Sequence, residues 1–182
     1  MLTRLRLKAA RKSIRSSSTE ESLSWLEPIQ ELGFTIVPGV LEATDIDGLL
    51  EELSRADLPR SRAGVRHAMR LPAVAAIAQE ARMMGIAREN LGRDAFPFRA
   101  TLFDKSPAAN WLVVWHQDTA LPLLSTRVTA VECLVPQGGV LAMRPLIVHA
   151  SSKSQSEAPR RVLHIEYAAS LGAGDGLELA IA

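Results

Sequence analysis

The feature that most constrains the fold of this chain is the pattern of its second half, from residue 96 onward. Every apolar run there is short, rich in branched or aromatic side chains, and closed by turn residues. Runs of this kind are typical of β-strands. We predict five or six strands, in the segments FPFRATLFDK, NWLVVWHQD, VTAVECLVP, GVLAMRPLIVHASS and RRVLHIEYAA.

The first half of the chain predicts helices around one short strand. The alternating, β-branched segment GFTIVPGVL, residues 33–41, indicates the strand. We expect helices near 20–32, from a capping box at Thr44 and Asp47 to about Ala56, and from Pro72 to Gly92. Helices followed by strands predict an α+β fold, with the helices packed on an antiparallel sheet or barrel.

Composition narrows the class of protein. The chain has 182 residues, 47% hydrophobic side chains and a net charge of +1, so we expect one globular domain over 20–182 with no electrostatic preference for nucleic acid. No apolar stretch approaches the ~20 residues of a membrane span. The single Cys133 excludes an internal disulfide and, by itself, a cysteine-based zinc site. A reducing, cytoplasmic location is the natural prediction.

Residues 1–19 differ from the rest of the chain. They hold six Lys or Arg residues, no acidic residue, and a cluster of serines. We predict a basic N-terminal tail outside the domain, since termini are often loosely held. The same composition is also typical of an organellar transit peptide, which would direct the protein to an organellar matrix, or of a segment that contacts an anionic surface.

The segment NWLVVWHQD ends with His116 and Asp118, two positions apart. A spacing of two on a strand puts both side chains on one face, where an imidazole nitrogen and a carboxylate oxygen can converge on a divalent metal. His149 closes another apolar run and is the candidate third ligand. Two histidines and one carboxylate form the facial triad that leaves three positions open on Fe(II).

The two remaining histidines are weaker candidates. His67 lies in a basic loop, where we expect it to be exposed. His164 alternates on the final strand and fits either the interior of a barrel or a packed core. A single H-x-D at a strand end more often has a structural role than a metal, so the third ligand and a cosubstrate anchor carry the prediction.

Arg160 begins the last strand, eleven positions after His149. In isolation an arginine there could pair with a structural carboxylate. Beside a metal triad, its planar guanidinium matches a carboxylate bidentately and could hold the far carboxylate of 2-oxoglutarate. Ser151 is two positions after His149 and could donate to the same carboxylate, whereas Arg161 points to the opposite face of its strand.

The segments NWLVVWHQD, GGVLAMRPLIVHASS and APRRVLHIEYA resemble those of the phytanoyl-CoA dioxygenase family, over most of residues 30–170. The resemblance implies a double-stranded β-helix, a jelly roll of cupin-like type, with the N-terminal helices packed on the sheet. It also implies Fe(II) as the metal, 2-oxoglutarate as cosubstrate, and O2 and a small organic molecule as substrates.

The resemblance assigns roles to individual residues. It implies that the iron ligands are His116, Asp118 and His149, and that the cosubstrate is bound by Arg160, Ser151 and Gln117, the last of which lies inside the H-Q-D motif. A carboxylate at 118 resembles the hydroxylases of the family rather than its halogenases. Leu112 departs from the pattern, because close relatives lead us to expect a lysine there.

The interval between His116 and His149 is only 33 residues. Strands of about five or six residues with their turns leave room there for about two strands, fewer than a jelly roll requires between these ligands. Either a segment between about Pro122 and Thr129 is missing from this sequence, or the barrel is incomplete and exposes strand edges.

The predicted function is therefore that of an Fe(II)- and 2-oxoglutarate-dependent dioxygenase that hydroxylates a small organic substrate. Two alternatives stay open. A cupin-type metal enzyme that does not use 2-oxoglutarate would keep the ligands and have no need of Arg160. A non-catalytic, degenerate jelly-roll binding protein is favoured if the barrel is truncated.

Overall fold

The computed structural model describes residues 3–9, 26–56, 64–107, 109–117, 129–174 and 177–179. Its helices are α1 (Leu26–Leu32), α2 (Ala43–Arg55), the 3-10 helix η1 (Ala68–Arg70), α3 (Pro72–Ala78) and α4 (Ala81–Leu91). Its strands are β1 (Thr3–Ala9), β2 (Phe34–Val37), β3 (Phe96–Lys105), β4 (Val113–His116), β5 (Thr129–Val135), β6 (Val140–Met143), β7 (His149–Ser151), β8 (Arg160–Ala168), β9 (Gly172–Gly174) and β10 (Leu177–Glu178). Helices and antiparallel strands are combined as predicted.

The single helix predicted from Pro72 to Gly92 is two helices, α3 and α4. Glu80 acts as the N-cap of α4, because its Oε2 accepts hydrogen bonds from the backbone N–H groups of Arg82 at 2.8 Å and Met83 at 3.1 Å. A carboxylate that satisfies the first free N–H groups of a helix favours a new helix start at that point. The prediction of one continuous helix was wrong for this reason.

Helix α2 also begins differently from the prediction. Its N-cap is Glu42, whose backbone N–H donates to Asp45 Oδ2 at 2.9 Å. The capping box therefore lies two positions before the one predicted at Thr44 and Asp47. A glutamate in place of the usual serine or threonine at the cap hid it from the sequence pattern.

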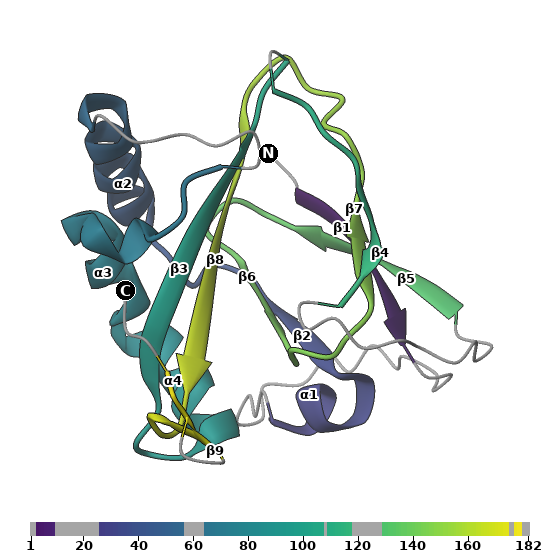
Figure 1. Cartoon of the computed structure of the whole chain (residues 1–182). Coiled ribbons are helices and arrows are strands. Elements are labelled where there is room, and N and C mark those ends of the chain that lie inside the picture. Colours follow the sequence, from purple (N-terminus) through teal and green to yellow (C-terminus); the bar gives the residue numbers. More distant parts are fainter. Residues whose placement is uncertain are drawn as a thin grey trace.

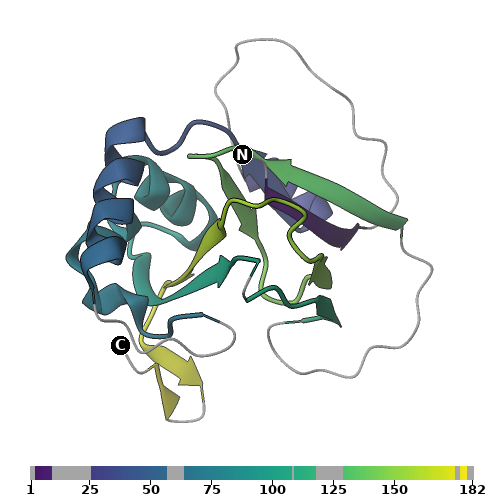
Figure 2. The same ribbon diagram turned by 90° about the horizontal axis from the view of Figure 1, so that it is seen from above.

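Strands β3 and β8 form the longest antiparallel pair, and helices α2, α3 and α4 cover one of its faces (Figures 1 and 2). The register runs from Phe96 opposite Ala168 to Lys105 opposite Arg160. The covered face and the helices share a buried core made of Leu53, Val65, Ala68, Val74, Ala100 and Leu102. Because side chains alternate along a strand, Lys105 and Arg160 lie on the opposite face, away from the helices.

A four-stranded antiparallel sheet, in the order β4-β7-β1-β5, lies across from this pair (Figure 1). Strand β1 is internal to it: it pairs with β5 from Thr3 opposite Val135 to Ala9 opposite Thr129, and with β7. The prediction that 1–19 is a tail outside the domain is therefore wrong for 3–9, because this stretch supplies a strand of the sheet. The other residues of 1–19 lie outside the described part of the chain.

The strands of the described residues do not close into a barrel. They form the four-stranded sheet and three pairs, β2 with β6, β3 with β8, and β9 with β10. The predicted break between Pro122 and Thr129 falls on residues that the structure does not describe. No described helix is long and apolar enough to cross a membrane.

A second core lies between the four-stranded sheet and the β2–β6 pair. Its buried members are Leu7, Phe34, Cys133 and Ile147. Burial raises the pKa of the Cys133 thiol to about 11, so this cysteine is a packing residue with little thiolate at neutral pH. The core thus joins β1, β2, β5 and the loop that leads into β7.

Candidate metal and anion site

The pairing of β4 with β7 brings two predicted ligands together. His116 is the Cα partner of His149, and the centroids of the two rings lie 4.2 Å apart. Val113 pairs with Ser151, so three steps on β4 match two on β7, and the register shifts between these pairs. Such a bulge re-aims side chains, and it places His116 on the same face as His149.

Both imidazoles have the same local hydrogen bond. His116 Nδ1 lies 2.9 Å from the carbonyl oxygen of Val114, and His149 Nδ1 lies 3.1 Å from that of Ile147. A carbonyl only accepts, so Nδ1 carries the proton in the neutral ring and Nε2 carries the lone pair. This is the tautomer that a metal-binding histidine requires when it binds through Nε2.

The predicted third ligand, Asp118, lies outside the described residues, two positions beyond His116. Within the described residues, no group of three His, Cys, Asp or Glu side chains is close enough to hold a metal. The structure therefore brings together two of the three predicted ligands and leaves Asp118 as a prediction.

Gln117, predicted to bind the cosubstrate, has a different contact. Its side-chain Nε2 donates to the carbonyl of Leu146, in the loop that precedes β7. This hydrogen bond ties the end of β4 to the loop that leads to His149. It supports the histidine pair, and the structure gives no contact between Gln117 and Arg160 or Ser151.

The other two predicted cosubstrate residues do meet. Arg160 Nη2 donates to Ser151 Oγ at 2.9 Å and to the carbonyl of Ser152 at 2.8 Å. Arg160 is only 5% exposed. Ser151 lies two positions beyond His149 on β7, which is about 6.6 Å along a strand and on the same face. The arginine site and the histidine pair are therefore adjacent parts of one surface.

Lys105 completes this group, although it was not among the residues predicted from the sequence. It is the Cα partner of Arg160, is 3% exposed, and its Nζ lies 3.2 Å from Ser151 Oγ and 3.1 Å from the carbonyl of Ser152. Nζ also lies 5.1 Å from the centroid of the Trp111 ring, within the range of a cation–π contact. No distinctive signal in the sequence marks it, because the same strand also carries Arg99 and Asp104.

Leu112, where the resemblance led us to expect a lysine, is 58% exposed. The lysine of this group comes from position 105 instead, at the end of β3. A lysine seven positions earlier in the chain can reach the same site because β3 and β8 are paired in register.

Lys105 and Arg160 are two buried cations for which the described residues supply no counter-ion. No carboxylate in that part of the chain pairs with either, and Arg160 Nε is buried with no hydrogen-bond partner there. Burial, and after it the charge of Arg160, lowers the pKa of Lys105 from 10.5 to about 8; burial also lowers the pKa of Arg160. Buried charges are normally paired. An anion bound beside Lys105 and Arg160 would supply the counter-charge.

The other histidines lie apart from the pair. His164 is opposite Thr101 on β3, and its ring centroid is 6.2 Å from that of Phe103. It shares the face of Arg160 on β8 and is half-buried. His67 is exposed and precedes η1 with a left-handed backbone, φ 57°.

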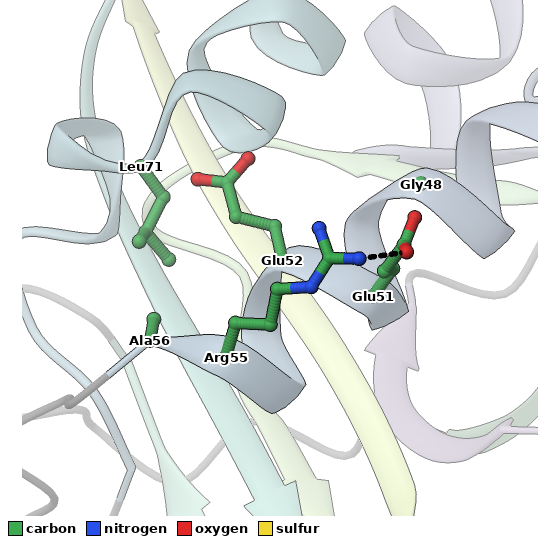
Figure 3. Close-up of a pocket in the computed structure, with 6 residues that line it drawn as sticks. All are labelled: Gly48, Glu51, Glu52, Arg55, Ala56 and Leu71. Atoms are coloured by element: carbon green, nitrogen blue, oxygen red, sulfur yellow. Dashed lines mark hydrogen bonds and ion pairs between the residues drawn. The ribbon is translucent and has the colours of Figure 1, made fainter.

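A pocket of about 380 Å³ opens on the far side of β3 and β8, along α2 (Figure 3). Its lining residues are Gly48, Glu51, Glu52, Arg55, Ala56 and Leu71. Its charged groups already have structural partners: Glu51 pairs with Arg55, and Glu52 Oε2 accepts from the backbone N–H of Ala73 at 2.8 Å, in the first turn of α3. The predicted site residues Arg160 and Ser151 meet on the other face of the β3–β8 pair.

Comparison with known proteins gives a fold but no family. No protein-family model and no curated protein sequence match the chain. Among solved structures, it is similar to the non-heme α-ketoglutarate-dependent epimerase SnoN from nogalamycin biosynthesis, with a TM-score of 0.68 and 17% identity over 86% of this chain and 93% of that one. The chain shares that fold.

Two further structures agree. The carbocyclase SnoK, also non-heme and α-ketoglutarate-dependent, has a TM-score of 0.65 at 15% identity, covering 86% of this chain and 89% of its own. HygX from Streptomyces hygroscopicus with iron bound has a TM-score of 0.66 at 14% identity, covering 81% and 86%. HygX is also known with nickel and 2-oxoglutarate bound.

Proposed function

We propose that this chain is an Fe(II)- and 2-oxoglutarate-dependent oxygenase that hydroxylates a small organic substrate. His116, Asp118 and His149 are the proposed iron ligands. Lys105, Arg160 and Ser151 are the proposed binding site for the far carboxylate of 2-oxoglutarate. The fold, the double-stranded β-helix in an incomplete form, and membership of the phytanoyl-CoA dioxygenase family are parts of the same proposal.

One observation carries the proposal: a buried cation pair, with no counter-ion in the described part of the chain, lies next to a histidine pair on one surface. The cation pair suits the far carboxylate of a dicarboxylate, and the histidine tautomers suit a metal. A metal enzyme that does not use 2-oxoglutarate would have no use for Lys105 and Arg160. The similar structures support the combination, because SnoN is α-ketoglutarate-dependent and HygX has iron bound.

The donor set fits a divalent first-row metal. Two neutral imidazoles and a carboxylate leave open positions for a chelating ligand. Bound Fe(II) would supply the chemistry that couples decarboxylation of 2-oxoglutarate and reduction of O2 to oxidation of a C–H bond.

The residues of the chain prepare that chemistry by orientation and charge. The carbonyls of Val114 and Ile147 orient both imidazole rings through Nδ1, so Nε2 is the nitrogen of each ring that would bind the metal. The Lys105 ammonium and the Arg160 guanidinium fix one end of the dicarboxylate, and Ser151 Oγ, which accepts from both, can turn its hydroxyl proton toward the ligand. Fixing one end directs the other end along β7 toward His149.

An anaerobic titration tests the proposal. Fe(II) followed by 2-oxoglutarate should produce the weak visible charge-transfer band of a chelated complex, whereas succinate, which has no keto group, should not. His149→Ala should abolish the band. Arg161→Lys, on the opposite face of β8 from Arg160, is the matched control and should retain it. Absence of the band with the wild-type chain at saturating metal would refute the proposal.

A second candidate is a binding protein that takes a carboxylate ligand without a metal reaction. The open strand edges among the described residues favour it. It predicts that 2-oxoglutarate and succinate bind equally well, and that Fe(II) changes neither affinity.

A further inference from the structure

Strand β1 lies in the sheet between two strands that are far from it in the sequence. It lies between β7, which carries His149, and β5 (Figure 1). The interval from His116 to His149 is too short for all the strands of a jelly roll, yet the sheet has a strand at this place. That strand comes from 3–9, far from the interval in the sequence.

Within β1, Leu7 is the residue closest to the proposed metal site. It is the Cα partner of His149 on one side and of Val131 on the other. Its side chain is fully buried and belongs to the core with Phe34, Cys133 and Ile147. Cross-strand partners share a face of the sheet, so Leu7 packs beside the histidine.

Ile147 connects this core to the imidazole ring. It is 8% exposed and packs in the same cluster as Leu7, and its carbonyl oxygen is the acceptor for His149 Nδ1 at 3.1 Å. Loss of the leucine side chain would leave a cavity beside the residue that orients the ring. The pairing of β7 with β1 covers only two residues, so packing rather than hydrogen bonding alone must hold β7 in place.

We propose that β1 completes the metal-binding sheet in place of a strand missing from the interval, and that Leu7 is a positioning residue for His149. The role of Leu7 rests on the proposed function, because it requires that His149 binds a metal. The position of β1 does not, and it is tested separately. The strand belongs to the same chain as the sheet that it completes.

The first experiment tests the position of β1 by cross-linking. Leu5 is the Cα partner of Cys133, and partners in an antiparallel pair lie within the Cα range of a disulfide. The Leu5→Cys chain, refolded from the reduced state in glutathione buffer, should form an intramolecular disulfide and lose both free thiols. Lys8→Cys, whose partner Ala130 is three positions from Cys133, should keep both.

Two outcomes would overturn the position. Refolded Leu5→Cys protein that retains two free thiols would show that β1 does not lie beside β5 in this register. A disulfide-linked dimer would show that the strand comes from another copy. Neither result depends on metal binding.

The second experiment tests Leu7 with Co(II), whose absorption reports the ligand set. We expect Leu7→Ala to weaken Co(II) binding about 10-fold, the low end of the effect of disturbing a group that orients a ligand. Leu7→Met, which refills the space, should restore it. Leu53→Ala, the same change in the separate core under α2, should leave Co(II) affinity unchanged.

The outcomes separate this inference from the proposed function. If wild-type protein binds no Co(II), the proposed metal site fails while the cross-link still reports on β1. If the wild type binds and Leu7→Ala and Leu53→Ala weaken binding equally, Leu7 acts through general stability and the positioning role is wrong. If Leu7→Ala does not fold, Leu7→Val replaces it: weaker Co(II) binding than in Leu53→Val supports the role, and equal binding in the two variants contradicts it.

Discussion

The two halves of the candidate site are built very differently. The cation half, Lys105 and Arg160, ends a long ladder between β3 and β8 that is backed by three helices and a continuous core. The histidine half lies on β4 and β7, which are short and are joined through a bulge, and β7 pairs on its other side with β1 from the other end of the chain. From this comparison we expect the proposed anion site to be the more rigid part and the proposed metal site to be the more easily disturbed one.

The largest expected effect comes from a cavity in the core that lies behind Lys105 and Arg160. Leu102 is 2% exposed, between β3 and the helices. We expect Leu102→Ala to lower the free energy of unfolding by about 2–5 kcal/mol, since it leaves a cavity in the core that supports the cation pair. Chemical denaturation followed by circular dichroism measures this. Leu134→Ala, at a leucine that is 42% exposed on β5, should lower the free energy of unfolding by less than about 1 kcal/mol. A similar loss in both variants would show that the two regions do not differ in packing.

Arg160→Lys should affect the ligand rather than the fold. A lysine keeps the charge but loses the bidentate geometry, so we expect 2-oxoglutarate binding to weaken by about 1–3 kcal/mol with Fe(II) affinity and Tm nearly unchanged. Calorimetric titration of the metal-loaded protein measures the loss. Arg161, which pairs with Asp104 at 3.4 Å on the other face, should tolerate the same change. Loss of binding in Arg161→Lys instead would reverse the assignment of faces.

The pH dependence of the anion site should follow Lys105, whose pKa is lowered to about 8. In the proposed site the protonated amine binds the carboxylate, so 2-oxoglutarate affinity should fall as pH rises through about 8, by roughly tenfold if the charge contributes about 1.4 kcal/mol. Stability of the ligand-free protein should change in the opposite direction. Between pH 8 and 10.5 the unfolded chain binds the additional proton, so the free energy of unfolding rises with pH.

Lys105→Arg is the matched control, because an arginine keeps its charge through this range. Its 2-oxoglutarate affinity should be nearly flat from about pH 7 to 9, well below the arginine pKa. A wild-type affinity that is flat over the same range would mean that Lys105 does not contact the carboxylate.

The smallest expected effect is at the opposite end of the same ladder. Arg99 and Glu166 form a two-bond ion pair, with Nε to Oε1 at 2.6 Å and Nη2 to Oε2 at 2.5 Å, and the arginine side chain is 53% exposed. An exposed pair contributes about 1 kcal/mol or less. We expect Arg99→Gln to change the free energy of unfolding by no more than that and to leave 2-oxoglutarate binding unchanged. A measurable loss of binding would extend the site along β3 and β8.

The sequence predicted what depends on local pattern. The spacing of His149 and Ser151 and the alternation on the last strand placed Arg160 correctly beside Ser151, since both follow from a period of two. Lys105 could not be found in this way, because its position depends on the register between β3 and β8, which are far apart in the sequence. The histidine pair also needed a bulge that no local pattern indicates.

Strand β1 was missed for a different reason. TRLRLKA alternates polar and apolar residues as a half-buried strand does, but its charge and its place in a basic segment favoured a tail. The alternation was the better guide. The position of β1 in the sheet is set by partners near the other end of the chain, so no local pattern could predict it.

The placement of β1 also sets an order of events during synthesis. Leu7 leaves the ribosome long before Val131 and His149, its partners in the sheet. Helices α2 to α4 and strand β3 can pack together as they leave the ribosome. Strand β1, which is half apolar, stays unpaired until most of the chain has been synthesised. Long-range pairing of this kind is slow. Chaperone dependence and aggregation during expression should therefore centre on this strand, and the proposed metal site should be the last part of the protein to form.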